Sequence, residues 1–393
     1  MLLLIYISFG IQLNCMKKFK LSYEKTYGYR LSDTDSKDYY DSTIEAEKIE
    51  EAVQKAERKL FRADFSTSSS VTDAILILPN KQEIYFPLHS KKYFETTKKL
   101  FEAMKECAVQ ASQLLLEHRG KTPNIGKETD HIPGIPDRST GTALTFLDSL
   151  LQEMFLKKVL EITSKIDLNV EEKTPIQQLF QSCPWLTLHC DPLDNTRAYI
   201  QGGQYFSSGY GLSDVLDRFT HTVVSAPTRG VLYTASPDGC DSLIMGKRSE
   251  RDSVPDADMN IVLSRSLLSE KGESCLRSAG FTIEGIRGAH LSIIDVALGN
   301  VGVLLYGAGN VHDVLLPYAF AKAKGATLTD ARGKDIVGKK LLRRKEGSNP
   351  LYERIPSTCY FASAFSKKNI VLDILSSDEN LHPAYLRARE REK

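Results

Sequence analysis

The sequence predicts a two-part α/β protein, in which an α+β half precedes an α/β half. Three patterns indicate this: apolar residues at helical spacing over 93–118, three strand-like runs over 223–245, and alternating strand and helix patterns after Asp256. A chain of 393 residues suggests two domains plus an extension, at roughly 150 residues per domain. We divide the chain into an apolar leader, an N-terminal extension and the two halves: 1–15, 16–90, 91–250 and 251–393.

The first 90 residues differ from the rest and suggest no chemistry. The leader is apolar, but it lacks the preceding positive charge and the clear cleavage site of a signal peptide. It is also short for a bilayer crossing, so we favour a translation start at Met16 over export or anchoring. Apolar residues over 37–62 lie close to helical spacing, and 68–88 predicts two short strands around a Pro79-Asn80 turn. The extension could be a regulatory module, a partner-binding module or an elaboration of the main sheet.

The α+β half begins with a long amphipathic helix over 93–118. A loop rich in Pro, Gly and charged residues is expected over 120–142, and a second helix begins near Thr145. Two strands are expected at 169–172 and 185–190, and the second of them ends at an acidic turn. The runs VVSAP, GVLYTAS and DSLIM then predict a strand meander.

The α/β half alternates strands with helices. Strands are expected at 259–266, 281–286, 301–306 and 327–330, and helices at 268–279, 288–298 and 313–324.

The composition is that of an ordinary globular protein and argues against two classes of partner. Lys and Arg number 51 against 50 Asp and Glu, so no overall field favours a nucleic-acid polymer or a membrane surface. The seven cysteines are scattered and include no C-x-x-C pair, which argues against a zinc ribbon or a dense disulfide framework. Buried thiols in a reducing, cytoplasmic compartment are the expectation.

The acidic turn is the most informative stretch. An apolar strand leads into Asp191, and Pro192 has no amide with which to continue the strand ladder. The carboxylates of Asp191 and Asp194 can converge on one point around such a turn. Magnesium takes oxygen ligands in octahedral geometry at about 2.1 Å. The turn therefore suggests a metal site, and Asn195-Thr196 can cap a helix whose first amides suit a phosphate.

The turn and its surroundings resemble the inositol monophosphatase superfamily, whose signature is D-P-[IL]-D-[GS]-T after a strand. Upstream, ALTFLDSLLQEMF resembles the helix with the T-x-x-D element, and NVEEKT resembles G-E-E-S. Downstream, GVLYTASPDGCDSLIMGKR resembles the family's hairpin. The stretch from Arg287 to Lys334 resembles the carboxy-terminal signature, in which W-D opens a helix. The likeness covers roughly two-thirds of the chain, over 95–365.

The resemblance implies a layered αβαβα sandwich with its active site between the halves, two or three Mg²⁺ ions, and lithium sensitivity. It implies these metal ligands: Glu171, Asp191, the backbone carbonyl of Leu193, Asp194 and Asp313. It also implies that Thr196, paired with Asp148, orients a metal-activated water that attacks the phosphoryl group. Glu172 is a further candidate catalytic residue. A homodimer is possible.

Each acidic residue also has a purely structural interpretation. Asp191 and Asp194 could form only a turn and cap, Asp148 could be an exposed helix residue, and Asp313 could be a helix N-cap. Glu171 and Glu172 could be a solvated strand end. Together and in this order, the five acidic positions favour the metal site.

Departures from the family's pattern bear on the substrate. Asn195 stands where the family has Gly or Ser, His312 replaces the Trp before Asp313, and a glutamate expected near Tyr306 is missing. The candidate substrate-binding residues are Asn195, Arg287, Gly288, Ala289 and His290. The basic character of the stretch from Arg287 to His290 suggests a second phosphate on the substrate.

We expect a small phosphorylated metabolite, an inositol phosphate first, with a 3′-phosphoadenosine nucleotide or a sugar bisphosphate as alternatives. A non-catalytic sensor of an inositol phosphate or nucleotide, with 16–90 as its output module, is the alternative from another class.

Overall fold

The computed structural model describes most of the two halves and parts of the extension. The described residues are 17–27, 36–46, 69–77, 83–85, 91–126, 144–183, 186–214, 219–244, 247–248, 260–265, 267–306, 310–330, 333, 358–363, 365–383 and 386. The predicted leader, residues 47–62 of the predicted helical segment and most of the predicted loop over 120–142 lie outside these ranges.

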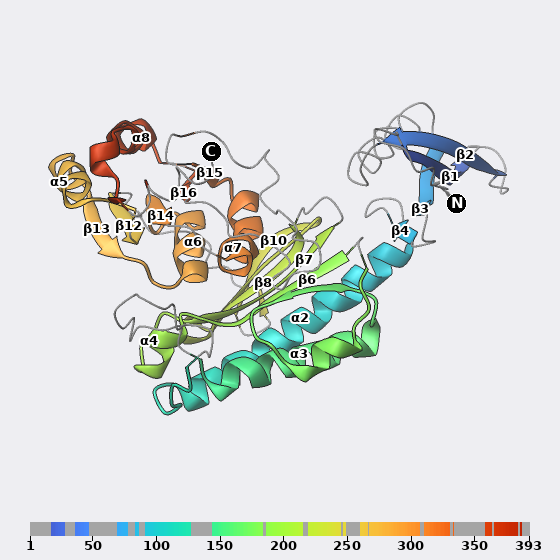
Figure 1. Cartoon of the computed structure of the whole chain (residues 1–393), viewed down its shortest axis with the longest axis horizontal. Coiled ribbons are helices and arrows are strands. Elements are labelled where there is room, and N and C mark those ends of the chain that lie inside the picture. The colour runs from blue at the N-terminus through green and yellow to red at the C-terminus, as the bar shows by residue number, and fades with distance from the viewer. Residues whose placement is uncertain are drawn as a thin grey trace.

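An antiparallel sheet forms in the N-terminal extension, at the upper right of Figure 1. Its strands are β1 (Lys17–Tyr27), β2 (Ser36–Ala46), β3 (Ser69–Ile77) and β4 (Glu83–Tyr85), in the order β2-β1-β3-β4. The two strands predicted over 68–88 are confirmed as β3 and β4. The helical spacing over 37–46 was misleading, because this segment forms β2. Its Tyr, Thr and Ile residues favour a strand and outweigh the spacing.

The α+β half is built on a seven-stranded sheet of order β11-β10-β9-β8-β7-β6-β5. Only β5 and β6 pair in parallel among these neighbours. The helices are α2 (Lys91–His118), α3 (Phe146–Ile162) and α4 (Thr196–Ile200). The strands are β5 (Asp167–Val170), β6 (Leu186–Asp194), β7 (Ser207–Asp214), β8 (Phe219–Ala226), β9 (Val231–Ser236), β10 (Gly239–Ile244) and β11 (Lys247–Arg248).

The α/β half is built on a five-stranded sheet of order β13-β12-β14-β16-β15. Its strands are β12 (Ile261–Arg265), β13 (Thr282–Gly285), β14 (Val303–Tyr306), β15 (Thr327–Thr329) and β16 (Thr358–Phe361). Its helices are α5 (Glu270–Ser278), α6 (Ala289–Ala297), α7 (Val311–Ala323) and α8 (Lys368–Ser376). The sequence analysis anticipated the elements from β12 to β15 but not β16 or α8.

The two sheets and their helices form five layers. Helices α2 and α3 cover one face of the seven-stranded sheet, and α6 and α7 lie between the two sheets (Figure 1). Helices α5 and α8 contact each other on the far side of the five-stranded sheet. The layered αβαβα sandwich expected from the sequence is confirmed. None of the described helices combines the length and hydrophobicity that a bilayer crossing requires.

Strand β7 was missed by the sequence analysis because its residues look like a turn. It reads SSGYGLSD, yet all eight of its residues are buried. Both faces of the strand are covered, and its two glycines lie close to side chains from α6 and α7. A β-carbon at Gly211 would lie 2.5 Å from Leu316, so small residues are required where these helices approach the sheet.

An apolar cluster fixes the base of the acidic turn. Leu193 and Tyr199 are buried against Leu115, Leu147 and Phe206, which come from α2, α3 and the start of β7. The rings of Tyr199 and Phe206 pack edge to face with their centroids 5.0 Å apart. The short helix α4 is therefore anchored by its buried tyrosine.

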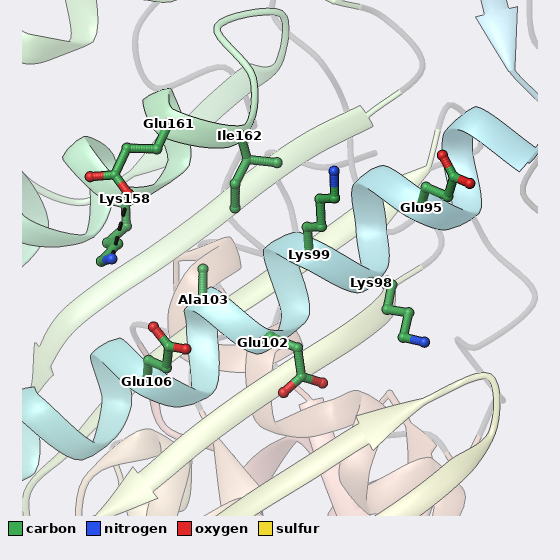
Figure 2. Close-up of a pocket in the computed structure, with 9 residues that line it drawn as sticks. All are labelled: Glu95, Lys98, Lys99, Glu102, Ala103, Glu106, Lys158, Glu161 and Ile162. Atoms are coloured by element: carbon green, nitrogen blue, oxygen red, sulfur yellow. Dashed lines mark hydrogen bonds and ion pairs between the residues drawn. The ribbon is translucent and has the colours of Figure 1, made fainter.

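A charged cavity lies on the outer face of the α+β half, between α2 and α3 (Figure 2). Its volume is about 470 Å³, and it is lined by Glu95, Lys98, Lys99, Glu102, Ala103, Glu106, Lys158, Glu161 and Ile162. Positive and negative side chains alternate here, and Lys158 pairs with Glu161 at 3.4 Å. None of the residues around the acidic turn lines this cavity, so we interpret it as a solvated helix–helix groove.

A buried ion pair joins the two halves. Arg229, in the turn between β8 and β9, donates two hydrogen bonds to the Asp295 carboxylate of α6, at 2.7 and 2.9 Å. The Asp295 side chain is 1% exposed. Removing one member of such a pair leaves the other charge partly buried and unpaired.

We predict that Asp295→Asn lowers the free energy of unfolding by about 3 kcal/mol, as measured by urea denaturation. The matched control is Glu153→Gln, which breaks the exposed Glu153–Lys157 pair at 3.8 Å. That control should change stability by less than about 1 kcal/mol. Equal losses in the two variants would contradict a structural role for the Arg229–Asp295 pair.

Candidate active site

The acidic turn interrupts the pairing between β6 and β7. The register shifts between Asp191 and Asp194, as expected where Pro192 cannot donate to the ladder. The amide of Leu193 donates to the Asp191 carboxylate at 3.1 Å, which closes the turn. Asn195 then adopts a left-handed conformation with φ 64°, and α4 starts at the next residue.

The sequence analysis predicted a side-chain cap that does not form. Asn195 makes no side-chain cap bond to α4, and its amide donates instead to the backbone carbonyl of Tyr205. The sequence analysis expected the first amides of this helix to bind a phosphate. Because α4 has only five residues, its dipole would attract a phosphate only weakly.

Asp194 is held by the first turn of α6. Its carboxylate accepts the amides of Ala289 and His290 at 3.1 and 3.0 Å, and the hydroxyl of Ser207 at 3.2 Å. A carboxylate at a helix N-terminus is favoured by the helix dipole. Gly288 permits this approach, because its φ is 80° and a β-carbon there would lie 2.7 Å from the Asp194 oxygen. The resemblance-based expectation that the two halves meet at this turn agrees with these contacts.

Asp148 and Thr196 lie together, as the sequence analysis expected. Asp148 closes a capping box at the start of α3, accepting the amide and hydroxyl of Thr145 at 2.8 and 2.7 Å. Its other oxygen lies 3.2 Å from the Thr196 hydroxyl, which is also 2.8 Å from the Leu193 carbonyl. Burial raises the pKa of Asp148 to about 7, against the opposing effect of the Thr145 hydrogen bonds. A carboxyl with that pKa can hold or release a proton near neutral pH.

Glu171 and Glu172 follow β5 directly and reach the turn from the sheet edge. The amide of Glu171 donates to the Cys190 carbonyl at 3.1 Å, which places Glu171 beside Asp191. The backbone of Glu172 is clamped by Gln152, which donates to its carbonyl at 2.6 Å and accepts its amide at 2.9 Å. The sequence analysis missed Gln152. Its position one helical turn after Asp148 was the available signal, since both then share a face of α3.

Asp313 lies in the first turn of α7, next to the other acidic residues. It is not the N-cap, which is Asn310. Asp313 instead accepts the Asn310 amide at 3.2 Å as the partner in a capping box. His312 lies 3.5 Å from the Asp313 carboxylate.

Burial and neighbouring negative charges both raise pKa values among the acidic residues. Burial raises the pKa of Asp191 well above its ordinary value, and the charges of Glu171, Asp194 and Asp313 raise it further. Burial also raises the pKa of Asp313, an effect that His312 opposes and that Glu171 and Asp194 reinforce. Buried carboxylates of like charge need either protons or cations for compensation.

The donor chemistry of these residues fits a hard divalent cation. Carboxylate oxygens and one backbone carbonyl are the ligands that Mg²⁺ prefers. In the described part of the chain, no three Asp, Glu, His or Cys side chains already converge at metal-ligand spacing. Asp194 and Asp313 also accept hydrogen bonds from backbone amides near the starts of α6 and α7, which occupy part of their lone pairs.

His290 and Arg287 are less available to a substrate than the sequence suggested. The His290 imidazole is 0% exposed and lies 3.5 Å from the Asp191 carboxylate, 3.3 Å from the Ser207 hydroxyl and 3.1 Å from the His312 carbonyl. It thus lies behind the acidic turn and links it to the start of α7. Arg287 pairs with Glu284 at 2.7 Å and with Asp295 at 3.4 Å.

No family model and no curated protein matches this chain, but solved structures with the same fold do, among them IMPases and IMPase/NADP phosphatases. An IMPase of Thermotoga maritima is 19% identical with a TM-score of 0.50, and the match covers 69% of this chain and 94% of that one. An IMPase/NADP phosphatase complexed with NADP and Ca²⁺ is 16% identical with a TM-score of 0.54, covering 73% and 98%. An IMPase/NADP phosphatase complexed with Mg²⁺ and phosphate is 16% identical with a TM-score of 0.53, covering 70% and 93%. The chain therefore has the layered α/β fold of the inositol monophosphatase type.

We predict that Gly209→Ala disturbs the packing of His290 against the acidic turn. Gly209 is the cross-strand partner of Asp191, and a β-carbon there would lie 2.5 Å from the His290 ring. The clash should lower the free energy of unfolding by about 1–3 kcal/mol, as measured by urea denaturation. Gly285→Ala is the control, because a β-carbon at Gly285 would meet nothing within 4 Å. A stability change in Gly209→Ala no larger than in the control would contradict this packing.

Proposed function

We propose that this protein is a magnesium-dependent phosphatase that hydrolyses a phosphomonoester of a small metabolite. One observation carries the proposal: acidic residues from three separate segments, with Asp191 and Asp194 buried, gather beside a carboxyl–hydroxyl pair, Asp148 and Thr196. Stability of the fold does not explain why these carboxylates lie together, because like charges placed side by side destabilise a protein. The fold shared with IMPases, one of them complexed with Mg²⁺ and phosphate, supports the same assignment.

The metal ligands are those suggested by the sequence. A first Mg²⁺ would be held by Glu171, Asp191 and the Leu193 carbonyl, and a second by Asp191, Asp194 and Asp313. Asp194 already accepts three hydrogen bonds, so it would bind through its remaining lone pair. When bound, such ions polarise the phosphoryl oxygens, lower the pKa of a water and stabilise the leaving alkoxide. A third ion, reached by Glu171 through water, is compatible with this set.

Asp148 and Thr196 supply the proton chemistry of the proposal. The Thr196 hydroxyl is fixed between Asp148 and the Leu193 carbonyl, so its lone pairs have a defined direction. It orients the attacking water, and Asp148, with its pKa near 7, accepts the proton that passes through the hydroxyl. Glu172, clamped by Gln152, contributes negative charge at the edge of the same site. No covalent enzyme intermediate is needed.

Among substrates, an inositol phosphate is our first candidate, and a phosphorylated nucleotide or a sugar bisphosphate is the alternative. We also expect millimolar lithium to inhibit the enzyme and the protein to form a homodimer.

The direct test is phosphate release by the purified full chain with Mg²⁺ or with EDTA. The substrates are inositol mono- and polyphosphates, 3′-phosphoadenosine 5′-phosphate and fructose 1,6-bisphosphate. We expect release from at least one substrate that EDTA abolishes, because the carboxylates repel a phosphate dianion unless cations intervene. If none of these substrates releases phosphate but Mg²⁺ still raises the melting temperature, the result would instead favour a non-catalytic binding protein.

We further predict that Asp191→Asn abolishes both turnover and stabilisation by Mg²⁺. At a Mg²⁺ concentration of about 100 times Kd, wild type should gain about 2.7 kcal/mol in unfolding free energy. The variant should fold, because removing one charge relieves repulsion with Glu171, Asp194 and Asp313.

Thermal melts with and without Mg²⁺ measure this difference. Asp373→Asn, on the exposed face of α8, is the control that keeps the Mg²⁺ response. Wild-type turnover in Asp191→Asn would refute the metal site.

A further inference from the structure

An exposed aromatic ring stands beside the proposed metal site. Tyr205 precedes β7 and is 42% exposed, although most large apolar side chains of the described residues are buried. The guanidinium of Arg287 lies over its ring, with the carbon atom 5.5 Å from the ring centroid. We call the pair formed by Tyr205 and Arg287 the aromatic platform. A guanidinium over an aromatic face makes a favourable contact and restricts both side chains.

The backbone beneath the aromatic platform is fixed from two sides. The Asn195 amide donates to the Tyr205 carbonyl, and the Thr228 hydroxyl donates to the preceding carbonyl, that of Gln204, at 2.6 Å. Asn195 is also the one described residue other than glycine with a positive φ. An exposed tyrosine on an otherwise unrestrained loop would show no such pattern of contacts. Fixing a ring before a ligand arrives reduces the entropy lost on binding.

The charge of the aromatic platform is already balanced. Arg287 contacts the carboxylates of Glu284 and Asp295, and Asp295 also pairs with Arg229. Two guanidinium groups therefore face two carboxylates. A site for a second substrate phosphate would need uncompensated positive charge, so this arrangement favours a neutral planar group over a second phosphate.

The aromatic platform adjoins the proposed metal ligand Asp194. Gly288, the residue after Arg287, is packed against Asp194 and Asn195. Ser207, two residues after Tyr205, donates its hydroxyl to the Asp194 carboxylate at 3.2 Å. Both members of the aromatic platform are therefore tied, through residues next to them in the chain, to the carboxylate that would hold a metal ion and the substrate phosphate.

We propose that the aromatic platform is a binding subsite for the base of a phosphorylated nucleoside. The proposal rests on the proposed phosphatase function and, because of the exposed Tyr205 ring, favours the nucleotide alternative over the inositol phosphate that the sequence suggested first. A base presents a neutral, planar π-face, which an alicyclic inositol ring or a simple sugar lacks. Base–aromatic stacking contributes to binding whichever base is present. Tyr205 acts as a specificity residue, while the proton chemistry stays with Asp148 and Thr196.

The test compares adenosine 5′-phosphate with ribose 5-phosphate, which differ by the base alone. With Mg²⁺, wild type should show a KM for adenosine 5′-phosphate roughly 10- to 100-fold below that for ribose 5-phosphate. Tyr205→Ala should abolish this ratio mainly through KM, because stacking stabilises ground and transition states equally. Tyr205→Trp should preserve the ratio, since it keeps a planar ring. Phe94→Ala, which removes an aromatic ring 55% exposed on α2, is the control that leaves the ratio unchanged.

Two kinds of failure are distinguishable. Equal KM values for the two substrates in wild type, or a ratio unchanged in Tyr205→Ala, overturn the subsite and leave the phosphatase assignment standing. No hydrolysis of any phosphomonoester overturns the proposed function. In that case, calorimetric titration with adenosine 5′-phosphate decides the subsite: binding at least tenfold weaker in Tyr205→Ala than in wild type supports it, and equal binding overturns it.

Discussion

The hydrogen bonds from the first amides of α6 to the Asp194 carboxylate are the contact on which the architecture of the site depends. They join the end of β6 in one half to a helix of the other half. The surrounding restrictions follow from that contact: Gly288 must lack a side chain, Gly209 must make room for His290, and Ser207 must be small and polar. A single carboxylate thus joins the two halves at the point where the chemistry is proposed.

Buried charge gives the site a second, opposing property. Burial and the neighbouring carboxylates raise the pKa values of Asp191 and Asp313, so the arrangement that would bind cations costs stability without them. The apolar cluster around Leu193 and Tyr199 and the Arg229–Asp295 pair contribute stability that offsets this cost.

Much of this could be predicted from the sequence, and the misses have physical causes. Helical periodicity located α2 and α3, and the family resemblance carried by the acidic motifs implied the layered sandwich. Strand β7 was missed because its residues are small where helices distant in the sequence pack closely against it. The cap role of Asn195 was misassigned because local preference does not reveal the Tyr205 carbonyl. His290 suggested a substrate contact by its charge, whereas its position behind Asp191 depends on tertiary packing.

The left-handed backbone of Asn195 makes this position sensitive to substitution in two ways. Glycine would adopt that conformation more easily, so the asparagine carries some conformational expense. Its side-chain amide ties the acidic turn to the carbonyl of Tyr205. A glycine here would therefore relax the backbone and remove the tie at once, whereas a larger residue without an amide would keep the strain and lose the contact.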